Sequence, residues 1–158
     1  MTAAPAEGKK APEFRMETLS GPKRLKDYAG RWLVLYFYPK DDTPGCTREA
    51  LDFTALAAEF DAAGAAILGV SRDPVSKHEK FAAKHGLTVE LGSDDAGSVS
   101  KSYGTWEEKS MYGRTYMGMA RRTFLIGPDG RIARTWQKVT VAGHAQEVLD
   151  EIRSRSRA

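Results

Sequence analysis

The feature that most constrains the fold is an apolar run of seven residues, Trp32–Tyr38, which ends at Pro39. The run is rich in β-forming residues and does not alternate clearly between apolar and polar positions. This pattern is typical of a central strand that is covered on both faces. A second apolar run, residues 65–70, has the same character, and the segment between the two runs has a helical period. Strand, helix and strand in this order indicate an α/β protein.

The helix after the first strand begins close to Cys46, which is the only cysteine of the chain. Thr43 has the chemistry of an N-cap, and Pro44 that of a first helical residue, because a proline there gives up only an N–H that would be unpaired. Cys46 follows at about the third helical position. Free backbone N–H groups and the positive end of the helix dipole favour a thiolate at that position.

Periodicity and turn signals predict the other elements. The helix from Pro44 to about Ala63 places Cys46 on its buried apolar face. Residues 1–31 are predicted to be a loop-rich entry with a small edge hairpin, followed after the second strand by a helix at 75–85 and a short strand at 87–91. A weak helix capped by Asp94 and Asp95 is predicted to end near Gly104, and residues 105–118 to form an ordered irregular loop. The chain is predicted to finish with an antiparallel hairpin of residues 121–126 and 131–137 and a last helix from Gly143 to about Arg153.

These elements predict a single α/β domain over residues 1–158, with a central mixed β-sheet flanked by helices. Residues 1–10 are expected to form a flexible N-terminal extension, and residues 154–158 a frayed basic tail. The tail is the only local run of cations and the net charge is +3, so no nucleic-acid partner is predicted.

The expected compartment is the cytoplasm, without attachment to a membrane. No apolar run approaches the roughly 20 residues that span a bilayer, and the first residues lack the pattern of a secretory signal. A single cysteine also excludes an internal disulfide framework.

A lone cysteine in a domain of this kind is more often a small buried apolar residue than a nucleophile. The position of Cys46 favours the nucleophile. The junction of strand and helix activates the thiol, and Gly45 leaves room for a small molecule to approach it.

The spacing Pro39-x-x-x-Thr43-x-x-Cys46 resembles the active-site pattern of the peroxiredoxins. The surrounding residues 37–47 are similar to the bacterioferritin-comigratory-protein (Q-type) branch. Further motifs of that branch are matched by Gly8-x-x-Ala11-Pro12-x-Phe14, Gly69-Val70-Ser71-x-Asp73, Ser76-x-x-x-Lys80-Phe81 with Lys84, Lys109-x-Met111-Tyr112-Gly113-x-x-Tyr116-x-Gly118 and Arg121-x-Thr123-Phe124-Leu125-Ile126.

This resemblance implies a thioredoxin-like fold and the reduction of hydrogen peroxide or organic hydroperoxides by Cys46, which becomes a sulfenic acid. It implies that Thr43 places its hydroxyl on the peroxide, that Arg121 stabilises the thiolate and the departing oxygen, and that Pro39 shields the sulfur from water. Glu49 matches the acidic partner that orients the arginine in relatives. No cofactor and no metal are expected.

Two further assignments near this site have alternatives. Arg121 and Arg122 point to opposite faces of a strand, so at most one of them faces the site, and the motif selects Arg121. Trp106 and Tyr112 are candidates for the rim of the peroxide pocket, with packing in the core as the alternative.

Many Q-type members carry a resolving cysteine five residues after the first, and Leu51 occupies that position here. An internal disulfide is therefore impossible. The resemblance implies a one-cysteine cycle in which an external thiol, either thioredoxin, glutaredoxin or a small thiol, reduces the sulfenic acid. A monomer is the default expectation.

Three other functions compete with the peroxidase. A thiol–disulfide oxidoreductase needs a second cysteine where Thr43 stands. A metal-dependent hydrolase would use His78, His85 and His144, but no further ligand has suitable spacing, and the first two are expected on a solvated helix face. A redox-inactive thioredoxin-like binding or holdase module keeps the fold and remains the alternative.

Overall fold

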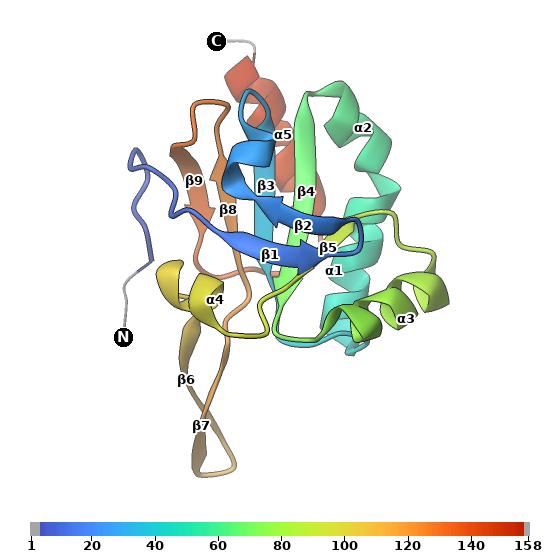
Figure 1. Cartoon of the computed structure of the whole chain (residues 1–158), viewed down its shortest axis with the longest axis vertical. Coiled ribbons are helices and arrows are strands. Elements are labelled where there is room, and N and C mark those ends of the chain that lie inside the picture. The colour runs from blue at the N-terminus through green and yellow to red at the C-terminus, as the bar shows by residue number, and fades with distance from the viewer. Residues whose placement is uncertain (1–3, 157–158) are drawn as a thin grey trace.

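The computed structural model describes residues 4–156, and its centre is a seven-stranded sheet with the order β2-β1-β5-β4-β3-β8-β9 (Figure 1). The strands are β1 (Arg15–Thr18), β2 (Gly21–Arg24), β3 (Trp32–Phe37), β4 (Ala65–Ser71), β5 (Glu90–Ser93), β6 (Trp106–Met111), β7 (Arg114–Met119), β8 (Arg122–Ile126) and β9 (Ile132–Trp136). The helices are η1 (Leu25–Tyr28), α1 (Pro44–Ala55), α2 (Ala57–Ala62), α3 (Val75–His85), α4 (Ser98–Ser102) and α5 (His144–Ser156).

Strand β3 lies inside the sheet, parallel to β4 and antiparallel to β8, so the predicted mixed sheet is confirmed. Its side chains alternate between two apolar cores, with Leu35 and Phe37 in one core and Tyr36 in the other. Both cores are closed to solvent. This explains why the run shows no alternation of polarity.

The two faces of the sheet are covered unequally. Apolar side chains of α1, α2, α3 and α5 pack on one face. The other face is covered by α4 and by the N-terminal segment that carries Ala11 and Phe14. The predicted edge hairpin is β1–β2, and the predicted terminal hairpin is β8–β9.

Two predicted elements have different bounds. The single helix predicted from Pro44 to Ala63 is two helices, because Leu56 leaves the helical conformation and its N–H bonds to the carbonyl of Phe53. The strand predicted at residues 87–91 begins only at Glu90. After the left-handed Gly86, the chain first makes a turn in which the Leu87 N–H bonds to the Ala82 carbonyl.

The prediction of an irregular loop at residues 105–118 is wrong. The segment forms the hairpin β6–β7, which projects from the rest of the molecule (Figure 1). Tyr112 and Gly113 at its tip both have positive φ, as a two-residue hairpin turn of type I′ requires. Because only the base of this hairpin, at Trp106 and Met119, packs on the apolar core, the rest of its sequence does not alternate between apolar and polar positions.

The ends of the described chain are attached to the sheet. Gly8 donates to Ile132 O at 2.8 Å, and Lys10 forms a bridge with Arg131. Helix α5 continues to Ser156. Residues 1–3 and 157–158 lie outside the described residues. Among residues 4–156, no helix combines the length and apolar character needed to cross a membrane.

Candidate active site

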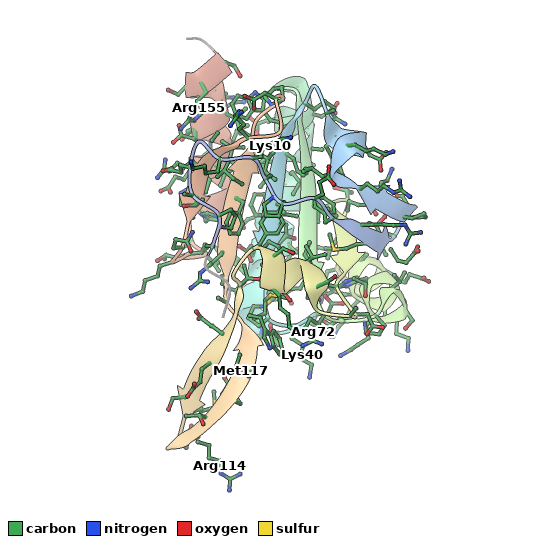
Figure 2. The ribbon with its side chains drawn as sticks, turned by 60° about the vertical axis from the view of Figure 1, so that its left-hand side comes forward. Lys10, Lys40, Arg72, Arg114, Met117 and Arg155 are labelled. Carbon is green, nitrogen blue, oxygen red and sulfur yellow. The ribbon has the colours of Figure 1, made fainter. Side chains whose placement is uncertain are left out.

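The candidate site lies where β3 ends and α1 begins. Residues 39–43 form the connection, and Arg121 directly precedes β8. Because β8 is antiparallel to β3, its first residues come to the end of the sheet at which β3 stops. Figure 2 shows Lys40 and Arg72 at this end of the molecule, close to the base of the β6–β7 hairpin.

Cys46 is the third residue of α1 and is 1% exposed, so the thiol faces the protein as predicted. Arg121 donates from Nη2 to Cys46 Sγ at 3.2 Å, across 75 positions of sequence. Gly45 makes room for this contact. A Cβ atom on Gly45 would lie 3.2 Å from Arg121 Nη2, which is tighter than usual.

The second end of the same guanidinium holds Glu49. Arg121 Nη1 donates to Glu49 Oε1 at 2.7 Å, and the carboxylate is buried one helical turn after Cys46. The guanidinium therefore bridges the sulfur and the carboxylate. Glu49 Oε2 and the neighbouring Tyr36 hydroxyl have no hydrogen-bond partner among the described residues.

Burial dominates the electrostatics of Glu49. It raises the pKa of the Glu49 carboxyl to about 7, although the charge and hydrogen bond of Arg121 act in the opposite direction. Burial lowers the pKa of Arg121, but the charges and hydrogen bonds of Glu49 and Cys46 outweigh it and the net shift is upward. The arginine therefore stays a cation beside the sulfur.

Thr43 occupies the N-cap position of α1 with extended backbone angles, but its side chain does not cap the helix. Its hydroxyl instead donates to Lys40 O at 3.0 Å. Pro39 follows β3 and is exposed. These two residues therefore frame the loop that leads to Cys46.

The other candidate residues make contacts that do not involve Cys46. Arg122 donates to the carbonyls of Gln137 and Gly104 and pairs with Glu107, so only Arg121 reaches the sulfur. Trp106 is half-buried, and the guanidinium carbon of Arg72 lies 4.3 Å from the centroid of the Trp106 ring. Tyr112 is 98% exposed in the turn between β6 and β7, so it does not pack in the core.

The prediction that His78 lies on a solvated face is wrong. Its ring is fully buried, and Nδ1 lies 2.6 Å from Asp41 Oδ2. His144 is also buried, and its Nε2 contacts the Thr123 hydroxyl at 2.8 Å. Within residues 4–156, no group of three or more histidine, cysteine, aspartate or glutamate side chains is arranged to hold a metal ion.

Comparison with known families matches residues 7–135 to the AhpC/TSA family. The chain belongs to this family. Its relatives are peroxiredoxins, and it is a thiol-dependent peroxidase, the class of enzyme that reduces hydroperoxides at the expense of a thiol. The predicted family, branch and thioredoxin-like fold are therefore confirmed.

Individual relatives show how far the likeness extends. Peroxiredoxin Bcp of Xanthomonas campestris pv. campestris is 50% identical over 133 residues, covering 84% of this chain and 83% of the relative. Peroxiredoxin Bcp of Bacillus subtilis is 43% identical over 150 residues, covering 94% of this chain and 96% of the relative. A solved structure of the Xanthomonas campestris bacterioferritin comigratory protein superposes with a TM-score of 0.88 at 44% identity, covering 95% of this chain and 99% of the other.

The site of this peroxiredoxin contains polar residues that sequence reasoning missed, namely Asp41, Asp73 and His78. Asp41 is buried whereas its neighbour Asp42 is exposed, and two adjacent aspartates give no signal that separates them. Asp41 and Asp73 both lie in stretches that resemble the Q-type branch, but that resemblance does not indicate what either side chain contacts.

Substitution of Glu49 by glutamine is expected to change the pH dependence of stability. The carboxyl keeps its proton up to about pH 7 in the folded protein but only up to about 4.5 when unfolded, so the folded state binds more protons between these values. The free energy of unfolding therefore falls as pH rises through this window, by at most about 1.4 kcal/mol per pH unit.

Urea unfolding of the wild type and Glu49→Gln at pH 5, 6, 7 and 8 measures this contribution as the difference between the two curves. His144, whose pKa burial lowers to about 4, gives the opposite slope but is present in both proteins and cancels. Parallel curves would contradict the prediction.

Proposed function

We propose that this enzyme reduces hydrogen peroxide and organic hydroperoxides at Cys46. The thiolate attacks one oxygen of the peroxide, an S–O bond forms, and the O–O bond breaks. The departing oxygen takes a proton and leaves as water or an alcohol, and Cys46 becomes a sulfenic acid. The observation that carries this proposal is the 3.2 Å contact from Arg121 Nη2 to Cys46 Sγ.

Arg121 has two tasks in this proposal. Its positive charge stabilises the thiolate before attack and the negative oxygen that develops as the O–O bond breaks. Glu49 holds the guanidinium from the opposite end at 2.7 Å, so the donor is already oriented when the peroxide arrives. An oriented donor needs no reorganisation during the reaction, which is the main source of its effect.

Thr43 and Pro39 complete the proposed site. Because the Thr43 hydrogen is donated to Lys40 O, the hydroxyl oxygen is left to accept a hydrogen bond from the O–H of a hydroperoxide. Pro39 lies at the start of the same loop and carries no backbone N–H, and we assign to it the exclusion of water from the sulfur.

The reductive half of the cycle requires another molecule. Cys46 is the only cysteine, so no second thiol of this chain is available. An external thiol attacks the sulfenic sulfur, water leaves, and a mixed disulfide forms; a second thiol then releases Cys46. Since Cys46 is 1% exposed, the first turn of α1 must open before a protein thiol can reach it.

One relative supports the choice of organic hydroperoxides as substrates. The structure of the Xanthomonas campestris protein was described in connection with its alkyl peroxide reduction activity, which supports organic hydroperoxides as substrates here. We assign the reductant to thioredoxin, glutaredoxin or a small thiol, the active form to a monomer, and the compartment to the cytoplasm.

Mass spectrometry after one equivalent of hydrogen peroxide tests the proposal. Cys46 is expected to gain one oxygen and to be trapped by a dimedone-type reagent within minutes, whereas Cys46→Ser provides the blank. Turnover should then require an added thiol system, and separate trials with thioredoxin and glutaredoxin identify the reductant. A free thiol that persists after peroxide would refute the role of Cys46.

A further inference from the structure

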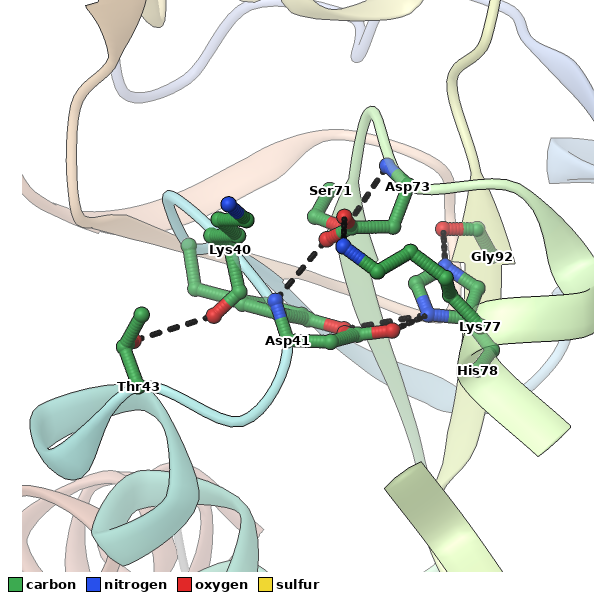
Figure 3. Close-up of polar contacts among 9 residues, drawn as sticks. Lys40, Asp41, Thr43, Ser71, Asp73, Lys77, His78 and Gly92 are labelled. Atoms are coloured by element: carbon green, nitrogen blue, oxygen red, sulfur yellow. Dashed lines mark hydrogen bonds and ion pairs between the residues drawn. The ribbon is translucent and has the colours of Figure 1, made fainter. Parts of the chain in front are cut away.

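A single peptide group connects Thr43 to the far side of the active-site loop. The carbonyl of Lys40 accepts the Thr43 hydroxyl at 3.0 Å, and the N–H of Asp41 donates to Asp73 Oδ2 at 2.8 Å. This C=O and this N–H belong to the same planar peptide. Figure 3 shows the two bonds on opposite sides of the loop, so the orientation of the peptide is fixed from both.

Asp73 is itself held in place. Its Oδ2 accepts the Ser71 hydroxyl at 2.7 Å, and its Oδ1 lies 3.3 Å from Lys77 Nζ. Its side chain is 9% exposed. Burial raises the pKa of Asp73, but the N–H of Asp41, the Ser71 hydroxyl and Lys77 outweigh it and lower the pKa. Asp73 is therefore a carboxylate with a fixed direction at neutral pH.

The Asp41 side chain provides a second anchor for the same loop. Its carboxylate accepts the Tyr38 hydroxyl at 2.5 Å and lies 2.6 Å from His78 Nδ1. The other ring nitrogen of His78 donates to Gly92 O at 2.9 Å, since a carbonyl only accepts. Helix α3 and strand β5 thus hold the side chain of Asp41 while Asp73 holds its backbone (Figure 3).

This arrangement accounts for the behaviour of the Thr43 side chain. A threonine at an N-cap ordinarily accepts a hydrogen bond from an N–H of the first helical turn. Thr43 makes no such bond, and the hydrogen bond that its hydroxyl donates to Lys40 O fixes the direction of the side chain. A peptide turned the other way would remove that acceptor and leave the Thr43 side chain free to turn its oxygen toward the first N–H groups of α1.

We propose that Asp73 is a positioning residue for Thr43, and that it acts through the peptide between Lys40 and Asp41. By holding the Asp41 N–H, Asp73 keeps the Lys40 carbonyl directed at the Thr43 hydroxyl hydrogen. The Thr43 oxygen then remains available to a hydroperoxide O–H. This proposal rests on the role of Thr43 given under Proposed function and adds a residue that does not itself touch the substrate.

Two rate constants of Cys46 separate positioning from a general loss of structure. Oxidation by hydrogen peroxide depends on Thr43, whereas alkylation by iodoacetamide requires only an accessible thiolate. Asp73→Ala is expected to slow peroxide oxidation about five- to tenfold and to change alkylation by no more than about twofold. Asp73→Asn should recover most of the peroxide rate, because the amide oxygen still accepts from the Asp41 N–H.

A double-mutant cycle with Thr43→Val gives the decisive comparison. If Asp73 acts through Thr43, Asp73→Ala adds less than about a twofold loss in the Thr43→Val protein. The proposal would be overturned if the effects of Asp73→Ala and Thr43→Val on the peroxide rate multiplied in the double variant. It would also be overturned if Asp73→Ala slowed oxidation and alkylation equally. Ser71→Ala, which removes one support of Asp73, provides the same cycle if Asp73→Ala does not fold.

Lys80→Ala, at an exposed position of α3, serves as the surface control and should match the wild type. Wild-type Cys46 that resists peroxide would refute the proposed function itself. If wild-type Cys46 is oxidised but the effects of Asp73→Ala and Thr43→Val on the rate multiply, only the role of Asp73 is refuted.

Discussion

Replacement of Arg121 by glutamine is expected to slow the oxidation of Cys46 by hydrogen peroxide about 10²–10³-fold. The variant loses the charge that lies 3.2 Å from the sulfur, and one oriented donor at a developing negative charge is worth roughly this factor. Glutamine retains polarity and much of the length, so the loss reports charge and geometry. Stopped-flow or quenched mass spectrometry under first-order conditions measures the rate.

Arg122→Gln is the matched control, because the two arginines are neighbours in sequence but contact different groups. Arg122 binds the Gln137 and Gly104 carbonyls and Glu107, none of which contacts Cys46. Its peroxide rate should stay close to that of the wild type, although its stability falls. Equal effects of the two substitutions would contradict the assignment of Arg121.

Replacement of Phe53 by alanine is expected to lower the free energy of unfolding by about 3–5 kcal/mol. Phe53 lies on α1, two turns after Cys46, and is fully buried. Its ring stacks on Tyr36 with centroids 4.7 Å apart and also packs on Phe60 and His144. Alanine does not fill the space that the ring occupies between these neighbours, so we expect a cavity. Urea unfolding measures the loss as a lower midpoint at an unchanged slope.

Leu51→Ala on the same helix is the control for this prediction. Leu51 is 38% exposed, so the substitution leaves no enclosed cavity and should cost about 1 kcal/mol or less. A loss at Phe53 as small as that at Leu51 would show that α1 does not depend on this ring for its attachment to the sheet.

Local chemistry made the central part of the fold predictable. The run Trp32–Tyr38, the stop at Pro39 and the helix start at Pro44 each follow from the properties of a few adjacent residues, and the structure has the strand and helix there. Elements without such local signals were predicted less well. The β6–β7 hairpin has no buried face along most of its length, and the buried residues Phe53 and Phe60 continue the apolar period across the break at Leu56, so the pattern does not mark it.

The sequence alone determined that this chain has one thiol, at the start of a helix, and no internal partner for it once oxidised. Only the tertiary structure decided what surrounds that thiol. Arg121 reaches Cys46 because β8 pairs antiparallel with β3, and Asp41 is buried while Asp42 is exposed because His78 of α3 lies beneath the loop. Contacts between residues 30 to 75 positions apart depend on how strands pair and helices pack, and no local pattern encodes them.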